Sequence, residues 1–346
     1  MNITFVLGQY KPNACGISDY VNLLSIELEK RGHFCQRISI DPTKGSTFLS
    51  VSQNLPQADL ISLQFAPYAF SPYGLSGVSL LKFGQAIRDR KLHVMFHEIW
   101  VGAYPRASWK ERFTGWRQKK EIMNFLDIAR PKAVHTSNSA ALDRLKRKGT
   151  NAQFLYLFGN IPYAPLPEER LINGQKLRIA FFGTLYESFP YIKFFKILNE
   201  FSITSKQTIC LIVLGRHRDQ LGLVSLKENA EIYKFEIEFM GELNTEEISH
   251  HLQRSDLGVS TTPFDVLGKS GTSAAMLEHG LPLLTYDDGD TQFEQLFVFE
   301  PFKEQVLLLN DPNWTEKMAN RLAVRKRSSF FNGVAQTADN LLEAII

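Results

Sequence analysis

Short apolar segments alternate with amphipathic segments along almost the whole chain, and this alternation limits the possible folds more than any other feature. Buried parallel strands separated by helices produce this pattern, because such strands are covered on both faces of their sheet. The sequence therefore predicts an α/β protein. The predicted strands cover residues 3–7, 35–40, 60–65, 93–98, 133–137 and 152–157, followed by 177–183, 208–215, 233–241, 257–261 and 281–285.

A polar, proline-rich segment around residues 162–173 separates the two series of predicted strands. This composition is typical of a linker, and 346 residues are enough for two domains of ordinary size. We predict two Rossmann-like, doubly wound domains, over residues 1–165 and 174–329, that face each other across a cleft. Residues 330–346 are predicted to form a helix that packs back on the first domain.

The composition excludes several classes of function. A formal net charge of +3 does not indicate a nucleic-acid partner. The three cysteines are widely spaced and form no CxxC pair, which argues against a disulfide framework and a structural metal site. The first residues match a buried strand better than a secretion signal, and no apolar run reaches the length of a membrane span. We therefore expect a cytoplasmic protein without a structural zinc site.

Polar residues follow two predicted strands of the first domain, at the sheet edge where ligands bind in such folds. Gly16 precedes the first predicted helix, whose N–H groups favour an anion and can be capped by Ser18 or Asp19. His97 and Glu98 end the fourth strand, where they would hydrogen-bond hydroxyl groups or move a proton near neutral pH. The alternatives are an ordinary capped turn and a histidine bonded to a carbonyl group. The absence of a GxGxxG spacing disfavours a dinucleotide cofactor.

Three turns of the second domain also follow strands. Gly183 with Thr184, and Gly241 with Glu242, would place backbone against a flat base or a sugar. Arg216 follows another strand, where a guanidinium group can hold a diphosphate, although a solvated surface arginine is an equal interpretation. We take these five residues as candidate ligand-binding residues.

The best candidate for a phosphate site is the segment 268–273, where two glycines, a lysine and hydroxyl side chains precede a predicted helix. Helix N–H groups, small residues and hydroxyl donors together suit a pyrophosphate. The GKS triplet is like the end of a nucleotide-triphosphate P-loop, but Pro263 stands where that loop requires glycine, so we reject that interpretation. An ordinary turn with a helix cap is the alternative. The candidate residues are Lys269, Ser270, Gly271, Thr272 and Ser273.

The order of these segments resembles that of GT-B glycosyltransferases, most closely the retaining class called family 4. The resemblance extends over nearly the whole chain and rests on GISDYVNLLSIELEKRGH, LQFAPYAFSPYGL, FHEIW, TSNSAALDRL with GNIP, FFGTL, FMGELNTEEISHHLQRSDLGVSTTPF and HGLPLLT. It implies transfer of a sugar from a nucleotide-diphosphate sugar to an acceptor hydroxyl, with retention and without a metal or cofactor. The second domain would bind this donor substrate, and the first domain a carbohydrate or lipid-linked carbohydrate acceptor.

The resemblance also implies roles for individual residues. Gly16 would contact the donor phosphates and His97 the transferred sugar. Gly241 and Glu242 would lie near the base, while residues 268–273 would hold the diphosphate.

Two carboxylates of the family pattern are missing. Leu267 and Ala275 stand where the family commonly has two glutamates ahead of its G-x-P turn. Glu278 lies one helical turn beyond Ala275 on nearly the same face and is the candidate substitute. Basic residues expected after FFG are also absent, so Lys269 or Arg216 is the candidate source of that charge. These losses favour one alternative, a catalytically silent GT-B protein that binds a nucleotide sugar or regulates a partner transferase. A second alternative is a nucleotide-sugar epimerase, because such epimerases share the two-domain fold.

Residues 107–130, ASWKERFTGWRQKKEIMNFLDIAR, form a basic and aromatic segment. Trp109, Phe113 and Trp116 occur at helical spacing, with basic residues among them. The pattern favours core packing of the aromatic rings beneath a solvated basic face. The alternative is a helix that lies on an anionic membrane, at the inner membrane face, and gives access to a lipid-linked acceptor.

Overall fold

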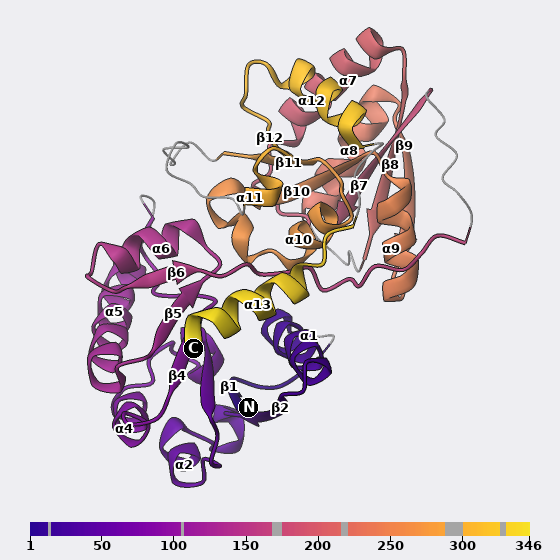
Figure 1. Ribbon diagram of the computed structural model, residues 1–346. Coiled ribbons are helices and arrows are strands. Elements are labelled where there is room, and N and C mark those ends of the chain that lie inside the picture. Colours follow the sequence, from indigo (N-terminus) through magenta and orange to yellow (C-terminus); the bar gives the residue numbers. More distant parts are fainter. Residues whose placement is uncertain (13–14, 105–106, 168–174, 216–220, 288–299, 326–329) are drawn as a thin grey trace. The chain divides into compact units, whose positions relative to one another are not determined.

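A computed structural model describes the chain except for residues 13–14, 105–106, 168–174, 216–220, 288–299 and 326–329. The chain divides into two compact units, Met1–Leu157 with Val334–Ile346, and Phe158–Gly333. Each unit contains one six-stranded sheet flanked by helices (Figure 1). The predicted α/β architecture with two Rossmann-like sheets is therefore confirmed.

The first sheet has the strand order β2-β1-β3-β4-β5-β6, and its strands pair in parallel. Because β2 and β3 lie on opposite sides of β1, the order reverses direction at β1 and β3. The strands are β1 (Asn2–Leu7), β2 (Phe34–Ser39), β3 (Leu60–Phe65), β4 (Leu92–Phe96), β5 (Ala133–Thr136) and β6 (Ala152–Phe154). The helices are α1 (Gly16–Lys30), η1 (Pro42–Lys44), α2 (Phe48–Gln53), α3 (Pro67–Phe70), α4 (Val78–Ala86), α5 (Trp109–Ala129), α6 (Ser139–Lys146) and α13 (Gly333–Ile345).

The second sheet has the order β12-β11-β10-β7-β8-β9, again with parallel pairing. Its direction reverses at β7 and β10. The strands are β7 (Lys176–Phe182), β8 (Thr208–Leu214), β9 (Glu236–Gly241), β10 (Leu257–Pro263), β11 (Leu283–Tyr286) and β12 (Val306–Leu308). The helices are α7 (Tyr191–Ser205), α8 (Leu221–Tyr233), α9 (Thr245–Arg254), η2 (Phe264–Lys269), α10 (Gly271–Glu278), α11 (Glu300–Lys303) and α12 (Trp314–Arg325).

The helix α13, which ends the chain, belongs to the first unit. The Thr337 hydroxyl donates to the carbonyl of Tyr156 at 3.1 Å, and the Arg31 guanidinium pairs with the Asp339 carboxylate. On the apolar side of α13, the side chains of Ala338, Leu341 and Ile345 are fully buried. Chain segments more than 150 residues apart thus complete one core.

The helix α5 differs from the sequence-based expectation. Trp109, Phe113 and Trp116 are 73%, 55% and 59% exposed, so the prediction that these rings pack in the core is wrong. The buried side of α5 consists instead of Gly115, Gln118, Ile122, Phe125, Leu126 and Ala129. Among the described residues, no helix is both long enough and apolar enough to span a bilayer.

Candidate functional site

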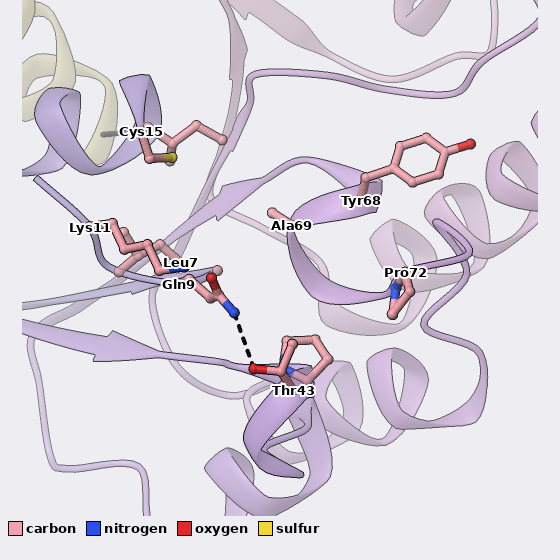
Figure 2. Close-up of a pocket in the computed structure, with 11 residues that line it drawn as sticks. Leu7, Gln9, Lys11, Cys15, Thr43, Tyr68, Ala69 and Pro72 are labelled. Carbon is pink, nitrogen blue, oxygen red and sulfur yellow. Dashed lines mark hydrogen bonds between the residues drawn. The ribbon is translucent and has the colours of Figure 1, made fainter. Parts of the chain in front are cut away.

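A pocket of about 300 Å³ lies in the first unit where β1 and β3 end (Figure 2). In doubly wound sheets, ligands bind beyond the carboxyl ends of the strands at the point where the strand order reverses. The pocket occupies that point. Its walls include Gln9, Lys11 and Cys15 before and at the start of α1, Thr43 of η1, and Tyr68 and Pro72 after β3.

Hydrogen bonds hold the polar wall of this pocket in place. The Gln9 amide donates to the Asp41 carboxylate at 2.7 Å and to the Thr43 hydroxyl at 3.4 Å. The Ser18 hydroxyl accepts from the backbone N–H of Lys11 at 2.9 Å and donates to the carbonyl of Gln9 at 3.2 Å. Amide, hydroxyl and ammonium groups beside an aromatic ring suit a hydroxylated ligand. This pocket could not be predicted from the sequence, because three separate chain segments form it.

The helix α1 begins at Gly16, and Asp19 lies in its first turn. Cys15 is the N-cap residue, and its side chain makes no capping hydrogen bond. Of the two residues predicted to cap this helix, Ser18 does not, because its hydroxyl bonds to the preceding turn. A side chain added at Gly16 would enter open space, so the backbone of this exposed residue is accessible.

His97 follows β4 and is 6% exposed. Its Nε2 lies 2.9 Å from Oε1 of Gln64, and its ring meets the Tyr20 ring edge-on at a centroid distance of 5.1 Å. Burial lowers the pKa of His97 to about 4, so the imidazole is neutral near pH 7. Glu98, by contrast, is exposed. The contact with Tyr20 brings His97 to the first turns of α1, the helix that contains Gly16 and Asp19.

In the second unit, the turn after β7 lies against the start of α10 at the point where the strand order reverses. Gly183 has a φ of 99°, and a Cβ added there would lie 2.6 Å from the Thr272 hydroxyl. The Thr261 hydroxyl of β10 donates to the carbonyl of Thr184 at 2.7 Å and accepts from the N–H of Tyr186 at 3.1 Å. Only glycine permits this close approach of the turn to the helix.

The segment 268–273 is helical rather than a loop. Gly268 and Lys269 end the short helix η2 and are exposed, and α10 begins at Gly271. Ser270 is the N-cap residue and accepts from the N–H of Ser273 at 3.2 Å. An α-helix has no internal acceptor for its first N–H groups. The structure therefore joins the helix end, the Thr272 hydroxyl and the Gly183 turn at one sheet edge.

The other predicted donor-binding residues of this unit lie elsewhere. Gly241 and Glu242 are exposed at the end of β9, an edge strand of the same sheet. Arg216 lies outside the described residues.

The face of α10 that lacks the family's carboxylate is covered by the protein's own backbone. Ala275 is fully buried, and a Cβ on Gly159 would lie 2.5 Å from the Ala275 Cα. Glu278 is 3% exposed, and its Oε1 accepts from the N–H of Gly159 at 3.0 Å. A larger side chain at position 275 would collide with this turn. The Glu278 carboxylate therefore lies against the Gly159 turn.

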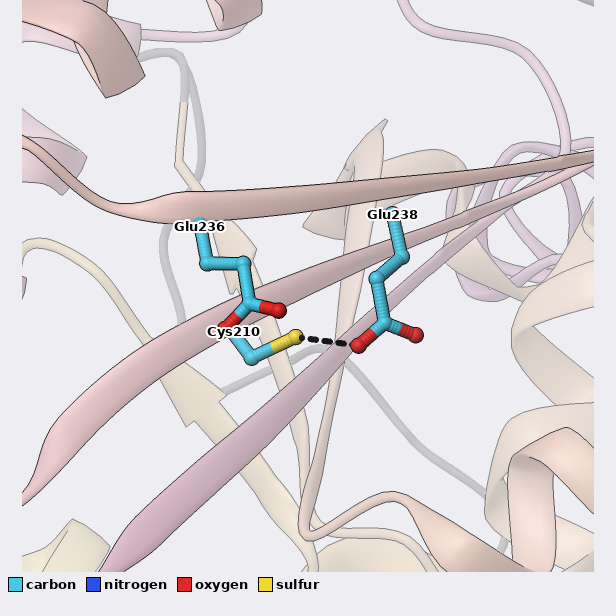
Figure 3. A group of neighbouring side chains, drawn as sticks. All are labelled: Cys210, Glu236 and Glu238. Carbon is cyan, nitrogen blue, oxygen red and sulfur yellow. Dashed lines mark hydrogen bonds between the residues drawn. The ribbon is translucent and has the colours of Figure 1, made fainter.

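One group of possible metal ligands is found among the described residues: Cys210, Glu236 and Glu238 (Figure 3). Both carboxylates already have cationic partners, since Lys176 lies 2.7 Å from Glu236 and Arg178 lies 3.1 Å from Glu238. The Cys210 thiol donates to Glu238 at 3.1 Å, and burial raises the pKa of this thiol to about 12. A metal requires a deprotonated thiolate. The chemistry of this group fits an ion-pair cluster on the sheet.

Solved structures resemble the whole chain. They include HepE of Anabaena in complex with UDP, with 13% identity over 99% of this chain and 100% of that one, at a TM-score of 0.55. The galactosyltransferase WaaB of the lipopolysaccharide outer core has 10% identity over 100% and 99% of the two chains, at a TM-score of 0.56. The UDP-GlcNAc 2-epimerase of Methanocaldococcus jannaschii has 10% identity over 99% of each chain, at a TM-score of 0.52. The chain has the GT-B fold.

The GT-B assignment rests on structure alone, because no protein-family model and no curated protein sequence matches the chain. The GT-B fold is shared by transferases and epimerases. The site residues therefore have to distinguish these functions.

Proposed function

We propose that this protein is a glycosyltransferase that moves a sugar, with retention, from a nucleotide-diphosphate sugar to a hydroxyl group of a carbohydrate or lipid-linked acceptor. The main support is the start of α10, where a helix end, the Thr272 hydroxyl and the Gly183 turn meet at the reversal point of the second sheet. This combination suits a diphosphate. HepE, which has the same fold, was crystallised with UDP.

In this proposal the backbone N–H groups of Gly271 and Thr272 bind the diphosphate, and exposed Lys269 adds a full positive charge. The turn at Gly183 and Thr184 lies along the sugar or phosphate, and Gly241 with Glu242 lies near the base. Ser270 and Ser273 shape the cradle, because their hydroxyl groups bond to each other at 2.8 Å.

In the first unit, we assign the acceptor to the pocket beside Tyr68 and Lys11, and the transferred sugar to His97. Asp19 and Glu98 remain candidate catalytic residues. A neutral, buried His97 suits contact with hydroxyl groups better than contact with phosphate.

Replacement of Lys269 by alanine should weaken binding of a nucleoside diphosphate by roughly tenfold to a hundredfold. The loss of one charge-assisted contact costs about 1.5–3 kcal/mol. Calorimetric titration of UDP, GDP and ADP into both proteins measures this effect. Lys196→Ala, which removes an exposed lysine of α7 in the same unit, is the matched control. Equal affinity in the Lys269 variant would reduce the segment to an ordinary helix start.

The alternative functions separate when nucleotide sugars are incubated without an acceptor. A transferase releases nucleoside diphosphate and free sugar slowly by transfer to water. An epimerase yields a second sugar isomer, and a silent protein leaves the donor unchanged.

We also propose that α5 binds an anionic membrane surface and brings the protein to a lipid-linked acceptor. At about 100° per residue, Trp109, Phe113, Trp116 and Lys120 lie within roughly 60° of one another around the helix. This stripe is opposite the buried side. Between residues 109 and 120 the helix has five basic residues and one acidic residue, and the acidic Glu111 bonds to Ser108 at the helix start. Aromatic rings flanked by cations are typical of interfacial helices.

Vesicles of phosphatidylglycerol should retain the full-length protein, and vesicles of phosphatidylcholine should not. Replacing Trp109 and Trp116 together by alanine should weaken retention by at least about tenfold, because both apolar contacts with the interface are lost. Co-sedimentation at low and high salt measures this. Ile192→Ala with Ile203→Ala, two exposed apolar residues of α7, is the matched control. Equal retention of both double variants would contradict the role of α5.

A further inference from the structure

A continuous chain of buried, hydrogen-bonded side chains extends from His97 across the first sheet. Gln64 of β3 contacts His97 at 2.9 Å and donates from Nε2 to the Ser62 hydroxyl at 2.8 Å. The Ser62 hydroxyl lies 2.8 Å from Nδ1 of His93 in β4, and His93 Nε2 lies 3.0 Å from Nδ1 of His135 in β5. All five side chains are at most 6% exposed.

The strand register produces this chain. Ser62 pairs with His93, and His135 pairs with Gln153 of β6, so these side chains share one face of the sheet. Gln153 is also a hydrogen-bond partner of His135 and is exposed. The hydrogen-bonded side chains thus extend from His97, a candidate catalytic residue, to β6, an edge strand of the sheet.

The chemistry of the groups gives every hydrogen bond the same direction. The Gln64 amide donates through nitrogen to Ser62, so its oxygen must accept the proton of His97 Nε2. Among the described residues the Ser62 hydroxyl has no other side-chain partner, so its single proton goes to Nδ1 of His93. A neutral His93 holds its own proton on Nε2 and donates it to His135. Burial lowers the pKa of His93 well below its ordinary value, which keeps this ring neutral.

We infer that Gln64, Ser62 and His93 are positioning residues that fix His97 as the Nε2–H tautomer, so that its Nδ1 offers a lone pair to a hydrogen-bond donor of the substrate. This inference rests on the proposed function. It identifies the substrate group that contacts Nδ1 of His97 as a sugar hydroxyl. A phosphate oxygen is excluded there, because two acceptors repel each other. Within the described residues, Nδ1 of His97 makes no hydrogen bond.

The chain acts by orientation and does not conduct protons. An amide cannot pass a proton from its oxygen to its nitrogen without forming the unstable imidic acid, so Gln64 interrupts any relay. Reversing the amide of Gln64 would reverse the direction of every bond in the chain and place the His97 proton on Nδ1. The tautomer of His97 therefore reports the direction of the whole chain.

Nitrogen NMR of the imidazole rings in the full-length chain tests the inference. His97→Gln assigns the His97 signals. At pH 7 we expect a single neutral form with the proton on Nε2. A proton on Nδ1, or a charged ring, would overturn the inference. The measurement needs no substrate, so it stands or fails separately from the proposed sugar transfer.

The substitution Ser62→Ala tests whether the hydrogen-bonded side chains position His97. In Ser62→Ala the Gln64 amide loses the acceptor that orients it, and His97 should show both tautomers. The matched control is Ser25→Ala, since Ser25 is equally buried in the same unit and its hydroxyl donates to the Val21 carbonyl at 2.6 Å. A single unchanged tautomer in both variants would overturn the positioning role.

Gln64→Glu tests the same link independently of Ser62. A buried carboxylate beside His97 should favour the protonated ring, so that His97 is charged at pH 6, where the wild-type ring is neutral. A His97 titration identical to that of the wild type would show that Gln64 does not control this ring.

Discussion

The free energy of unfolding of the first unit should fall by several kcal/mol when the pH is lowered from 6.5 to 4.5. Three buried histidines cause this effect. Burial lowers the pKa of His97 and of His135 to about 4, and that of His93 well below its ordinary value. In the unfolded chain each would titrate near 6.5, as an exposed histidine does.

The sign follows from proton uptake. From pH 6.5 down to about 4, the unfolded chain binds protons at these rings and the folded chain does not, so acid favours unfolding. More than about one pH unit above 6.5, all three rings are neutral in both states. A difference of one pKa unit corresponds to about 1.4 kcal/mol, so His97 and His135 each contribute about 2–3 kcal/mol by pH 4.5.

Denaturant unfolding at several pH values measures this loss. Tryptophan fluorescence reports mainly on the first unit, which contains three of the four tryptophans. The pKa of the Asp41 carboxyl in this unit is lowered by hydrogen bonds from Thr43 and Gln9, so its contribution to stability is lost mainly below about pH 4. In His135→Gln the loss between pH 6.5 and 4.5 should shrink by about 2 kcal/mol. Equal unfolding free energies at the two pH values would contradict this account.

The strands were the most predictable part of this protein. The run predicted at residues 60–65 is β3, Leu60–Phe65, and the run predicted at 208–215 is β8, Thr208–Leu214. A parallel strand covered on both faces needs a continuous apolar run, which is visible in the sequence alone. The same logic located the turns after strands, since ligand-binding edges follow strand ends.

The orientation of α5 was not predictable from spacing. Trp109, Phe113 and Trp116 repeat at helical intervals, but so do Gly115, Gln118 and Ile122, which form the buried side. Periodicity shows that a helix has two faces and does not show which one is covered. At Gly115 the carbonyl oxygen of Val101 approaches so closely that a Cβ would lie 1.9 Å from it, a contact that no local pattern reveals.

The polar chain behind His97 also could not be foreseen. Ser62 and His93 are 31 residues apart, and His93 and His135 are 42 apart, so only the strand order brings them into contact. The pocket beside Tyr68 has the same origin, because it needs the reversal of strand order at β1 and β3. Sites whose residues come from neighbouring strands cannot be predicted until the order of the strands in the sheet is known.

Glu278→Ala should lower the free energy of unfolding of the second unit by about 2–4 kcal/mol. The substitution leaves the buried N–H of Gly159 without its carboxylate acceptor and opens a cavity beneath the turn. Glu278→Gln keeps an oxygen at the same place, so it should cost only about 1 kcal/mol. Denaturant unfolding compares the two variants. The control is Glu228→Ala, at an exposed residue of α8, which should change the free energy of unfolding by less than about 0.5 kcal/mol.

The same variants decide whether Glu278 replaces the missing donor-binding carboxylate. If its role is to hold the Gly159 turn against Ala275, Glu278→Gln should bind UDP, GDP or ADP within about twofold of the wild type. A carboxylate that accepts hydrogen bonds from two ribose hydroxyls would lose roughly tenfold on conversion to an amide. Because Oε1 already accepts from Gly159 at 3.0 Å in a nearly closed environment, we expect the first result. A tenfold loss of affinity with unchanged stability would instead make Glu278 a ligand-binding residue.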